Sequence, residues 1–280
     1  MIISLNGKWQ IKDDERKFEF VGNVPGTVQG ALILQKLVPH PYIGLNEKNI
    51  QDLENKSWIY IKEFELDNLP TEENVELVFE GIDTLSDIYL NGRYLSNTED
   101  MFLEYRFDIK GILKKGKNIL KVNIKSPVKE PQTLERMYGK LNAGRESARS
   151  YIRKAQYSYG WDWGARVATS GIWRPVYIES YNRARLTGCT AYLEKVCDKE
   201  GKIRISGYIA STVDLDNLEN YKVEVKVNDK TLSKLPIEYN PIGIQFNGTF
   251  TLKDIQLWFP NGLGEPVSYT HLTLPTTPYV

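Results

Sequence analysis

The sequence predicts an all-β protein, and three observations lead to this fold class. Apolar and polar residues alternate with a period of two in many short segments, which is the pattern of half-buried strands. Turn-forming residues separate these segments at short, regular intervals. Helix signals are few, and aromatic residues, which favour strands, make up 11% of the chain.

The first half of the chain predicts a series of strands that are joined by tight turns. The segment 86–97 gives the clearest signal, because two short alternating runs flank Asn91-Gly92. This dipeptide tolerates the positive φ angles of a type I′ turn, so we expect a tight hairpin. Further strands are expected in these segments: 57–66, 74–82, 105–127 and 171–182.

Two segments depart from the strand pattern. Residues 27–37 follow Pro25-Gly26 and predict a short helix with Thr27 as its N-cap. Residues 131–156 are polar, mixed and interrupted by glycine, which predicts a long loop with a helical turn or two. Long loops inside a compact β domain are usually functional or disordered.

The character of the chain shifts near residue 180, where a second set of short strands begins. Segment 220–235 alternates most strictly and has a predicted turn at Asn228-Asp229. Evenly spaced short strands of this kind are typical of an immunoglobulin-like β-sandwich. We therefore expect a jelly-roll sandwich over 1–181 and an incomplete immunoglobulin-like sandwich over 182–266.

The last fourteen residues, 267–280, carry no charge and lack alternation that is tied to turns. They could form a last strand or a disordered tail, or they could be translated sequencing-adaptor read-through. We favour the third interpretation and expect a non-native tail. His271 would then not be native, which leaves His40 as the remaining histidine.

Composition excludes several classes of partner. Lys plus Arg equals Asp plus Glu at 36 each, so nothing favours nucleic acid or an anionic membrane. Cys189 and Cys197 could pair across a hairpin, but two free thiols in a reducing compartment fit better. The N-terminal sequence lacks the pattern of a signal peptide, and no apolar run approaches a membrane span of about 20 residues. These features predict a soluble, cytoplasmic protein.

The chain has few of the histidine and cysteine residues that bind metals or act as nucleophiles and bases. The chain has two histidines, far apart in sequence, and two cysteines, which makes a zinc site or a Ser-His-Asp triad improbable. No phosphate-binding G-x-x-x-x-G-K-[ST] loop occurs. We therefore expect no metal and no cofactor.

The stretch SYGWDWGARVATSGIWRPV (158–176) places Asp162 between Trp161 and Trp163, with glycines on both sides. An indole stacks on the apolar C–H face of a hexose, and a carboxylate accepts hydrogen bonds from paired hydroxyls. The alternative is that both tryptophans belong to the core and that Asp162 caps a turn. The residues alone leave both interpretations open.

A resemblance decides between them. The stretches LNGKWQ (5–10), PHPYIGLNE (39–47), GIDTLSDIYLNG (81–92) and KAQYSYGWDWG (154–164) occur in one register with others up to residue 266. In this the chain resembles the N-terminal part of the β-mannosidases of glycoside hydrolase family 2. The resemblance implies a jelly-roll domain, an immunoglobulin-like domain and a catalytic (β/α)₈ barrel, of which the barrel is absent from this chain.

The same resemblance implies roles for individual residues. Asp162 would bind hydroxyls of a terminal β-mannose, Trp161 would wall the pocket, and Trp163 would pack inward behind the loop. Supporting positions in the same motif are Arg153, Lys154 and Gln156. The family usually has proline where this chain has Ala165, so the loop is expected to be slightly less rigid. Glu47, in the chain's only Asn-Glu pair, aligns with a first-domain segment and is not expected to be catalytic.

The resulting hypothesis is the N-terminal portion of a retaining exo-β-mannosidase, which contributes substrate-pocket residues but no catalytic carboxylate. Its expected partners are a terminal β-mannosyl oligosaccharide and the barrel in the same polypeptide, and we expect no hydrolysis by this chain alone. The alternatives are a stand-alone carbohydrate-binding sandwich and a purely structural β-sandwich. Gene sequence that continues into a barrel favours the enzyme, and burial of Asp162 favours the structural protein.

Overall fold

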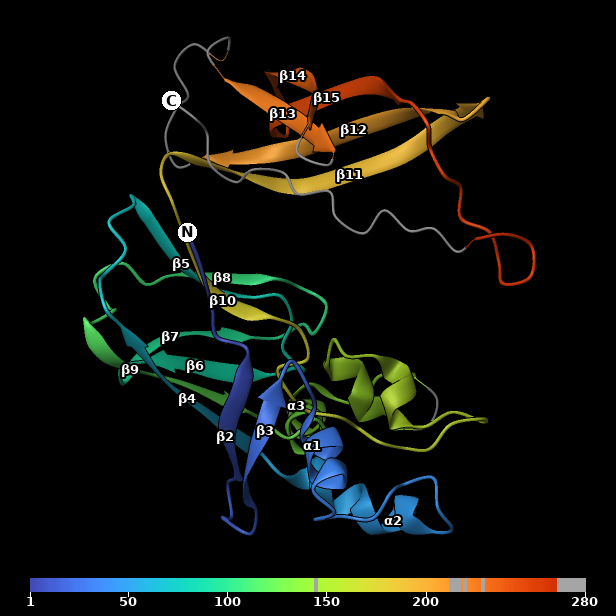
Figure 1. Cartoon of the computed structure of the whole chain (residues 1–280). Helices are drawn as coiled ribbons and strands as arrows, with labels where there is room; N and C mark the ends of the chain where they lie inside the picture. The colour runs from blue at the N-terminus through green and yellow to red at the C-terminus, as the bar shows by residue number, and fades with distance from the viewer. Residues whose placement is uncertain (144–145, 212–217, 219–220, 228–229, 266–280) are drawn as a thin grey trace. The chain divides into compact units, whose positions relative to one another are not determined.

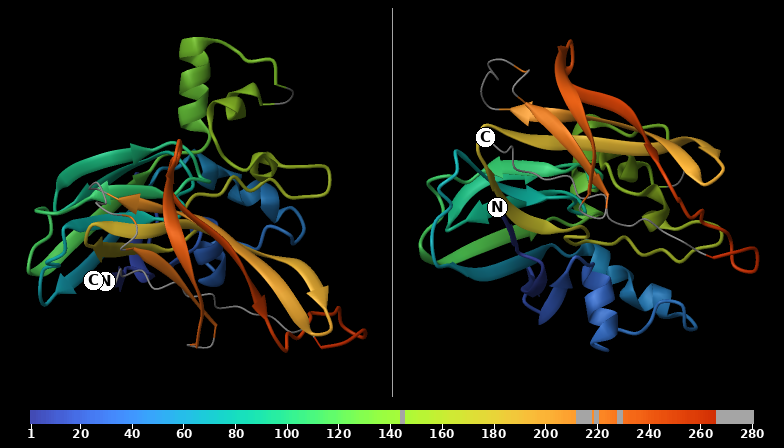
Figure 2. Two further views of the ribbon diagram at one scale, coloured as in Figure 1. Left: turned by 90° about the horizontal axis from the view of Figure 1, so that it is seen from above. Right: turned by 45° about the horizontal axis from the view of Figure 1, so that its top comes forward.

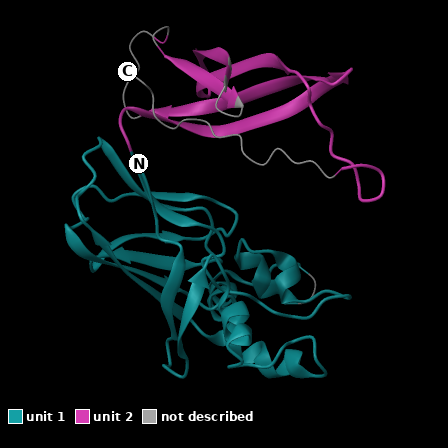
Figure 3. Cartoon of the chain, viewed as in Figure 1, with its two compact units in different colours: residues 1–180 teal, residues 181–280 magenta. Residues whose placement is uncertain are grey.

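A computed structural model describes residues 1–143, 146–211, 218, 221–227 and 230–265 of the chain (Figure 1). The chain divides into two compact units, residues 1–180 and 181–280 (Figure 3). This division lies one residue before the boundary that the sequence predicts. Strands dominate both units, which confirms the predicted all-β fold class. The predicted turn at Asn228-Asp229 and the predicted tail at 267–280 lie outside the described residues.

The first unit is a sandwich of two antiparallel sheets. The smaller sheet has four strands, in the order β1 (Ile2–Ser4), β10 (Val176–Tyr181), β5 (Asn74–Phe79) and β8 (Tyr105–Asp108). The larger sheet has six strands, in the order β3 (Glu19–Val24), β2 (Gly7–Asp13), β4 (Trp58–Leu66), β9 (Gly116–Ile124), β6 (Ser86–Leu90) and β7 (Arg93–Thr98).

Alternation places one face of each strand in the core of this sandwich. Trp58 and Tyr60 of β4 are buried, whereas Ile59 and Ile61 between and after them are partly exposed. Trp9 packs edge-on against Tyr60, with ring centroids 6.3 Å apart. Burying aromatic side chains of this size is a large part of the stabilisation of such a core.

The two ends of the first unit meet in one sheet. β1 pairs antiparallel with β10 in the register Ile2↔Glu179, Ile3↔Ile178 and Ser4↔Tyr177. Leu5 N extends this pairing with a 2.9 Å hydrogen bond to Val176 O. The last strand of the unit is therefore held between its first strand and β5.

The predicted hairpin at Asn91-Gly92 joins β6 to β7. Asn91 has φ 53° and Gly92 has φ 82°, which are the two positive angles that a type I′ turn requires. The Asn91 side chain also donates to Ile112 O and Asn118 Oδ1 and accepts from Ile119 N, at 2.9–3.0 Å. The Asn91 side chain thus links the turn to the neighbouring strand β9 by hydrogen bonds.

Two substitutions separate the effect of the positive φ at Asn91 from that of its side-chain hydrogen bonds. Asn91→Gly keeps the backbone angle and removes three hydrogen bonds, whereas Asn91→Ala also introduces strain at positive φ. We expect Asn91→Gly to lower the free energy of unfolding by about 1–3 kcal/mol and Asn91→Ala by about 1 kcal/mol more. Urea denaturation followed by tryptophan fluorescence measures both. Equal losses for the two variants would contradict a role for the positive φ.

Short helices accompany the sandwich. Helix α1 (Val28–Leu34) begins after Thr27, whose Oγ1 accepts from Gly30 N at 3.1 Å, so the predicted N-cap is confirmed. Helix α2 (Asn46–Ile50) runs into the 3₁₀ helix η1 (Gln51–Asn55). The segment 131–156, predicted as a loop with a helical turn or two, includes most of a ten-residue helix, α3 (Lys129–Tyr138), and the 3₁₀ helix η2 (Ser147–Tyr151). Figure 2 shows α3 and η2 next to each other at one side of the strands.

The described part of the second unit is one five-stranded antiparallel sheet. The strand order is β11 (Ala184–Cys197), β12 (Glu200–Ser211), β15 (Gly243–Leu252), β14 (Lys230–Asn240) and β13 (Lys222–Val227). β14 pairs with β13 up to Pro236 and with β15 from Ile237 onward. This change of partner lets Val225 of β13 and Phe246 of β15 enter the same core. The immunoglobulin-like character of this unit stays a prediction.

Two further expectations concern the whole chain. Cys189 and Cys197 are both exposed and are not bonded to each other. Within the described residues, no helix combines the length and the apolar character that crossing a bilayer requires.

Candidate functional site

The segment that carries Trp161, Asp162 and Trp163 is a loop between η3 (Gln156–Tyr159) and β10. Its tip is closed by two backbone hydrogen bonds between Trp161 and Gly164, of 3.5 and 3.3 Å. Gly160 before the tip has φ 92°, and a Cβ there would lie 3.3 Å from Arg166 Cβ. Gly160 is therefore required by backbone conformation and by a close approach. Gly164 has open space around its Cα and no positive φ.

All three residues of the tip face solvent. Trp161 is 51% exposed and Trp163 is 81% exposed, and their rings meet edge to face with centroids 5.7 Å apart. The expectation that Trp163 packs inward is therefore wrong: the tight turn from Trp161 to Gly164 points both indoles outward. Asp162 is also exposed. Among the described residues, no hydrogen bond or ion pair occupies its carboxylate.

A buried ion pair fixes the base of this loop. Lys154 Nζ lies 2.5 Å from both carboxylate oxygens of Asp83, and the two side chains are 0% and 1% exposed. The same ammonium donates to Thr169 O at 2.9 Å and contacts Thr169 Oγ1 at 3.1 Å. Lys154 and Thr169 lie at the two ends of the loop. This contact therefore joins the two stems of the loop, which are the segments before and after the tip at 161–164. Burial lowers the pKa of the Lys154 ammonium, and the Asp83 carboxylate opposes that shift.

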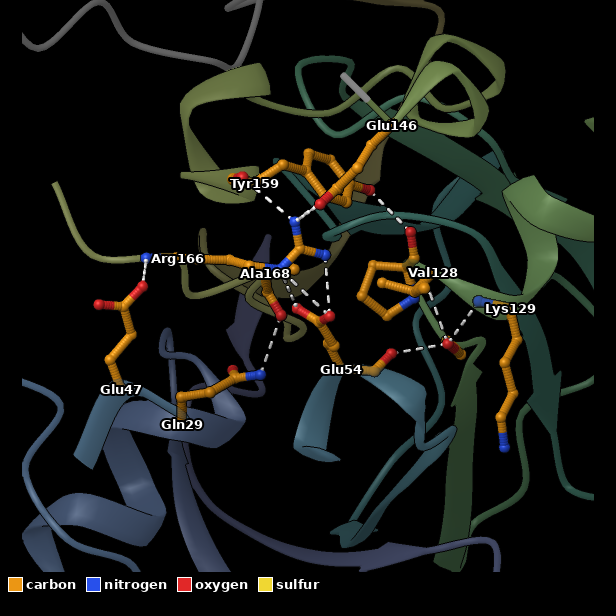
Figure 4. A network of polar contacts seen from close by, with 11 residues as sticks. Gln29, Glu47, Glu54, Val128, Lys129, Glu146, Tyr159, Arg166 and Ala168 are labelled. Atoms are coloured by element: carbon orange, nitrogen blue, oxygen red, sulfur yellow. Dashed lines mark hydrogen bonds and ion pairs between the residues drawn. The ribbon is translucent and has the colours of Figure 1, made fainter. Parts of the chain in front are cut away.

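Arg166 forms a second anchor on the returning stem (Figure 4). Its Nη2 donates to Glu54 Oε1 at 2.8 Å and its Nη1 donates to Glu146 and, at 3.2 Å, to Tyr159 O. The Arg166 backbone N–H donates to Glu47 Oε1 at 2.7 Å. Burial raises the pKa of Glu54, which the hydrogen bonds and charge of Arg166 partly offset.

Helix α1 adds a third anchor beyond Arg166. Gln29 Nε2 donates to Ala168 O at 3.1 Å (Figure 4). Gln29 Oε1 accepts from Ser170 N at 3.2 Å. The stem is thereby tied to α1, α2 and η1, all of which lie between β3 and β4 in the chain. The arrangement is a rigid stem that carries an exposed tip of two indoles and one free carboxylate.

The supporting residues that the sequence predicts divide into two groups. Lys154 lies buried beneath the loop, as described above. Arg153 is exposed, and its Nε lies 3.4 Å from Asp100 Oδ2. Gln156 is also exposed, and its Nε2 donates to the carbonyls of Arg149 and Lys154 at 3.2 Å each. Arg153 and Gln156 thus lie beside the stem rather than under the tip.

Sequence reasoning missed Asp83, Glu54 and Arg166, which position the loop. Glu47, set aside above as a catalyst, binds the Arg166 backbone from the first turn of α2. Within the described residues, no group of three or more His, Cys, Asp or Glu side chains is arranged to hold a metal ion.

Comparison with known families agrees with this geometry. The family model described as "Glycosyl hydrolase 2 galactose-binding domain-like" matches residues 9–174, more than half of the chain and almost all of the first unit. The chain belongs to this family. The matched range of this glycosyl hydrolase 2 domain includes the loop tip and all three of its anchors.

Individual relatives of the glycosyl hydrolase 2 domain include several proteins named β-mannosidase. The β-mannosidase of Bos taurus is 35% identical over 202 residues, which cover 66% of this chain and 22% of that protein. Beta-mannosidase B of Aspergillus oryzae is 29% identical over 276 residues, which cover 95% of this chain and 32% of that protein. The chain thus spans about a third or less of the length of these relatives.

Solved structures agree with the sequence comparison. The β-D-mannosidase of Dictyoglomus thermophilum matches with a TM-score of 0.73 and 35% identity, over 95% of this chain and 33% of that one. An exo-chitosanase of Amycolatopsis orientalis matches with a TM-score of 0.62 at 15% identity, which shows the fold alone. The resemblance to the N-terminal part of family 2 β-mannosidases is therefore confirmed, and the chain is a glycosidase-related domain.

Proposed function

We propose that this chain is the sugar-binding N-terminal part of a retaining exo-β-mannosidase. The observation that carries the proposal is the loop tip, where the unoccupied Asp162 carboxylate lies between two exposed indoles on a stem with three anchors. An aromatic face suits the C–H face of a hexose, and a carboxylate suits two adjacent hydroxyls. The relatives named β-mannosidase support mannose as that hexose.

In this proposal the chain supplies binding and not bond cleavage. Retaining glycosidases use two carboxylates about 5–5.5 Å apart, one as nucleophile and one as acid/base. We assign both to a (β/α)₈ barrel in the same polypeptide and neither to residues 1–280. Trp161 and Asp162 would then form one wall of the pocket for the terminal mannose, and the barrel would form the other.

The test uses the 280-residue chain itself. We expect no release of nitrophenol from 4-nitrophenyl β-D-mannopyranoside, because the catalytic carboxylates are not assigned to it. We expect weak binding of methyl β-D-mannopyranoside, detected by saturation-transfer NMR. Asp162→Asn should weaken that binding about tenfold, since a hydrogen bond to a charged group contributes about 1.5–3 kcal/mol.

Asp67→Asn is the matched control, because Asp67 is also exposed but lies in the turn after β4. It should leave binding unchanged. Mannoside binding that survives Asp162→Asn, or turnover by the chain that a mock preparation lacks, would contradict the proposal.

A further inference from the structure

A shallow hollow beside the loop stem is lined by polar groups that take no part in the proposed mannose site. It lies between η2, the segment 152–156 and the turn that follows β7, and its lining includes Phe102, Arg149, Ile152, Arg153 and Gln156. The hollow is distinct from the loop tip, because none of Trp161, Asp162 and Trp163 lines it.

The backbone around the hollow is held firmly. Met101 N donates to Arg153 O at 3.0 Å, and Asp100 and Arg153 form a parallel bridge. Trp173 Nε1 donates to Met101 O at 3.0 Å, which ties this bridge to the segment before β10. The two Gln156 hydrogen bonds described above fix the floor between Arg149 and Lys154. A ligand would therefore meet preformed walls, which lowers the entropy cost of binding.

The charges on the hollow are unbalanced. Arg149 and Arg153 line it, and none of its described lining residues is acidic. Within the described chain, no acidic side chain pairs with the Arg149 guanidinium. Arg153 is 80% exposed and has one long contact, to Asp100, whose other carboxylate oxygen accepts from Phe102 N at 2.8 Å. Glu146, the nearest acid in sequence to Arg149, is engaged by Arg166.

The remaining lining groups favour a sugar over a bare anion. Phe102 is more than half exposed and offers an aromatic face, and Ile152 is a buried apolar floor. The Gln156 amide donates to two carbonyls, so its Oε1 remains as an acceptor for a hydroxyl. Guanidinium groups bind carboxylates in a bidentate, directional way.

We infer that this hollow binds a carboxylate-bearing sugar, with the sugar ring against Phe102 and the carboxylate between Arg149 and Arg153. The inference goes beyond the proposed function, which concerns a neutral sugar at Asp162. It gives the chain a second, acid-selective sugar site on the same unit.

The experiment compares three probes on the 280-residue chain by NMR titration: D-galacturonate, D-galactose and acetate. Galacturonate and galactose differ only at C6, so their difference reports the carboxylate. We expect galacturonate to bind at least about tenfold more tightly than either galactose or acetate, and to weaken between about 0.02 and 0.5 M NaCl. Arg149→Gln and Arg153→Gln should each weaken galacturonate binding about tenfold.

Arg93→Gln is the control, because Arg93 is an exposed arginine on the β6–β7 hairpin that does not line the hollow. Arg149→Gln and Arg153→Gln should melt at the wild-type temperature, so lost binding is not lost folding. Equal affinity for galacturonate and galactose, or an equal loss in Arg93→Gln, overturns the inference. Acetate that binds as tightly as galacturonate also overturns it, since the sugar ring would then contribute nothing.

Asp162→Asn separates this site from the proposed mannose site. Galacturonate binding that persists in this variant supports the hollow. Galacturonate binding that is lost in it places the ligand at the loop tip and overturns the inference, while the proposed function remains to be judged by its own mannoside titration.

Discussion

Lys154→Met is expected to lower the free energy of unfolding of the first unit by about 3–5 kcal/mol, because it removes one partner of a buried ion pair. The Asp83 carboxylate would stay buried, with its side chain 1% exposed. Among the described residues, Thr84 Oγ1 and Thr169 Oγ1 would remain as its hydrogen-bond donors. Five of the six tryptophans lie in residues 1–180. Urea denaturation followed by tryptophan fluorescence therefore reports mainly on this unit.

Two further variants test the cause of that loss. Lys117→Met removes the partner of Glu63 in a pair whose side chains are both 57% exposed, and it should cost less than about 1 kcal/mol. The double variant Asp83→Asn/Lys154→Met removes both charges and should recover part of the stability. A Lys154→Met variant that is as stable as Lys117→Met would show that the buried pair does not hold the loop stems together.

Arg166→Met is expected to lower the free energy of unfolding by about 2–3 kcal/mol at neutral pH, because it leaves the Glu54 carboxylate buried without its guanidinium partner. Glu54 has a side chain that is 10% exposed, and burial already raises its pKa above 4.5. Without Arg166, the hydrogen bonds and charge that lower this pKa disappear, so the pKa rises further.

The loss of stability in Arg166→Met should depend on pH, because Glu54 titrates. A carboxyl with a raised pKa binds more protons in the folded than in the unfolded state between pH 4.5 and its folded pKa. Its contribution to stability therefore falls as pH rises through that window. The deficit of Arg166→Met relative to wild type should be smallest near pH 4.5 and grow towards pH 7, as urea denaturation across this range would show. A deficit that is constant with pH would contradict the role given to Glu54.

Local features of this fold could be predicted from the sequence because their causes are local. The alternation of apolar and polar residues predicted the strand around Trp58. The tolerance of Asn91-Gly92 for positive φ predicted the hairpin, and the Thr27 hydroxyl predicted the start of α1. Helix α3 was expected only as a turn or two, because the segment 131–156 is polar, mixed and interrupted by glycine. In the structure the buried residue of this helix is Pro131. The helix ends at Gly139, which has a positive φ. Glycine is common directly after the last residue of a helix.

The anchors of the loop could not be predicted, because their partners lie far apart in the chain. Asp83 and Lys154 are separated by 71 positions, and Glu54 and Arg166 by 112. No propensity or period indicates such pairs. The expected orientation of Trp163 was wrong for a related reason: its place after Asp162 in the motif suggested that it packs inward, but the tight turn closed by the hydrogen bonds between Trp161 and Gly164 leaves its indole exposed. The motif predicted which residues form the tip, and only the fold shows what holds it.

The pairing of β1 with β10 has a consequence for synthesis on the ribosome. The first strand leaves the ribosome long before Val176–Tyr181, the strand beside which it lies. At about 5–20 residues per second, the delay is on the order of ten to thirty seconds. During that time β1 has no partner, and the four-stranded sheet is incomplete. Nascent chains that end before residue 176 should therefore depend on chaperones, and protease resistance should appear only after β10 has emerged.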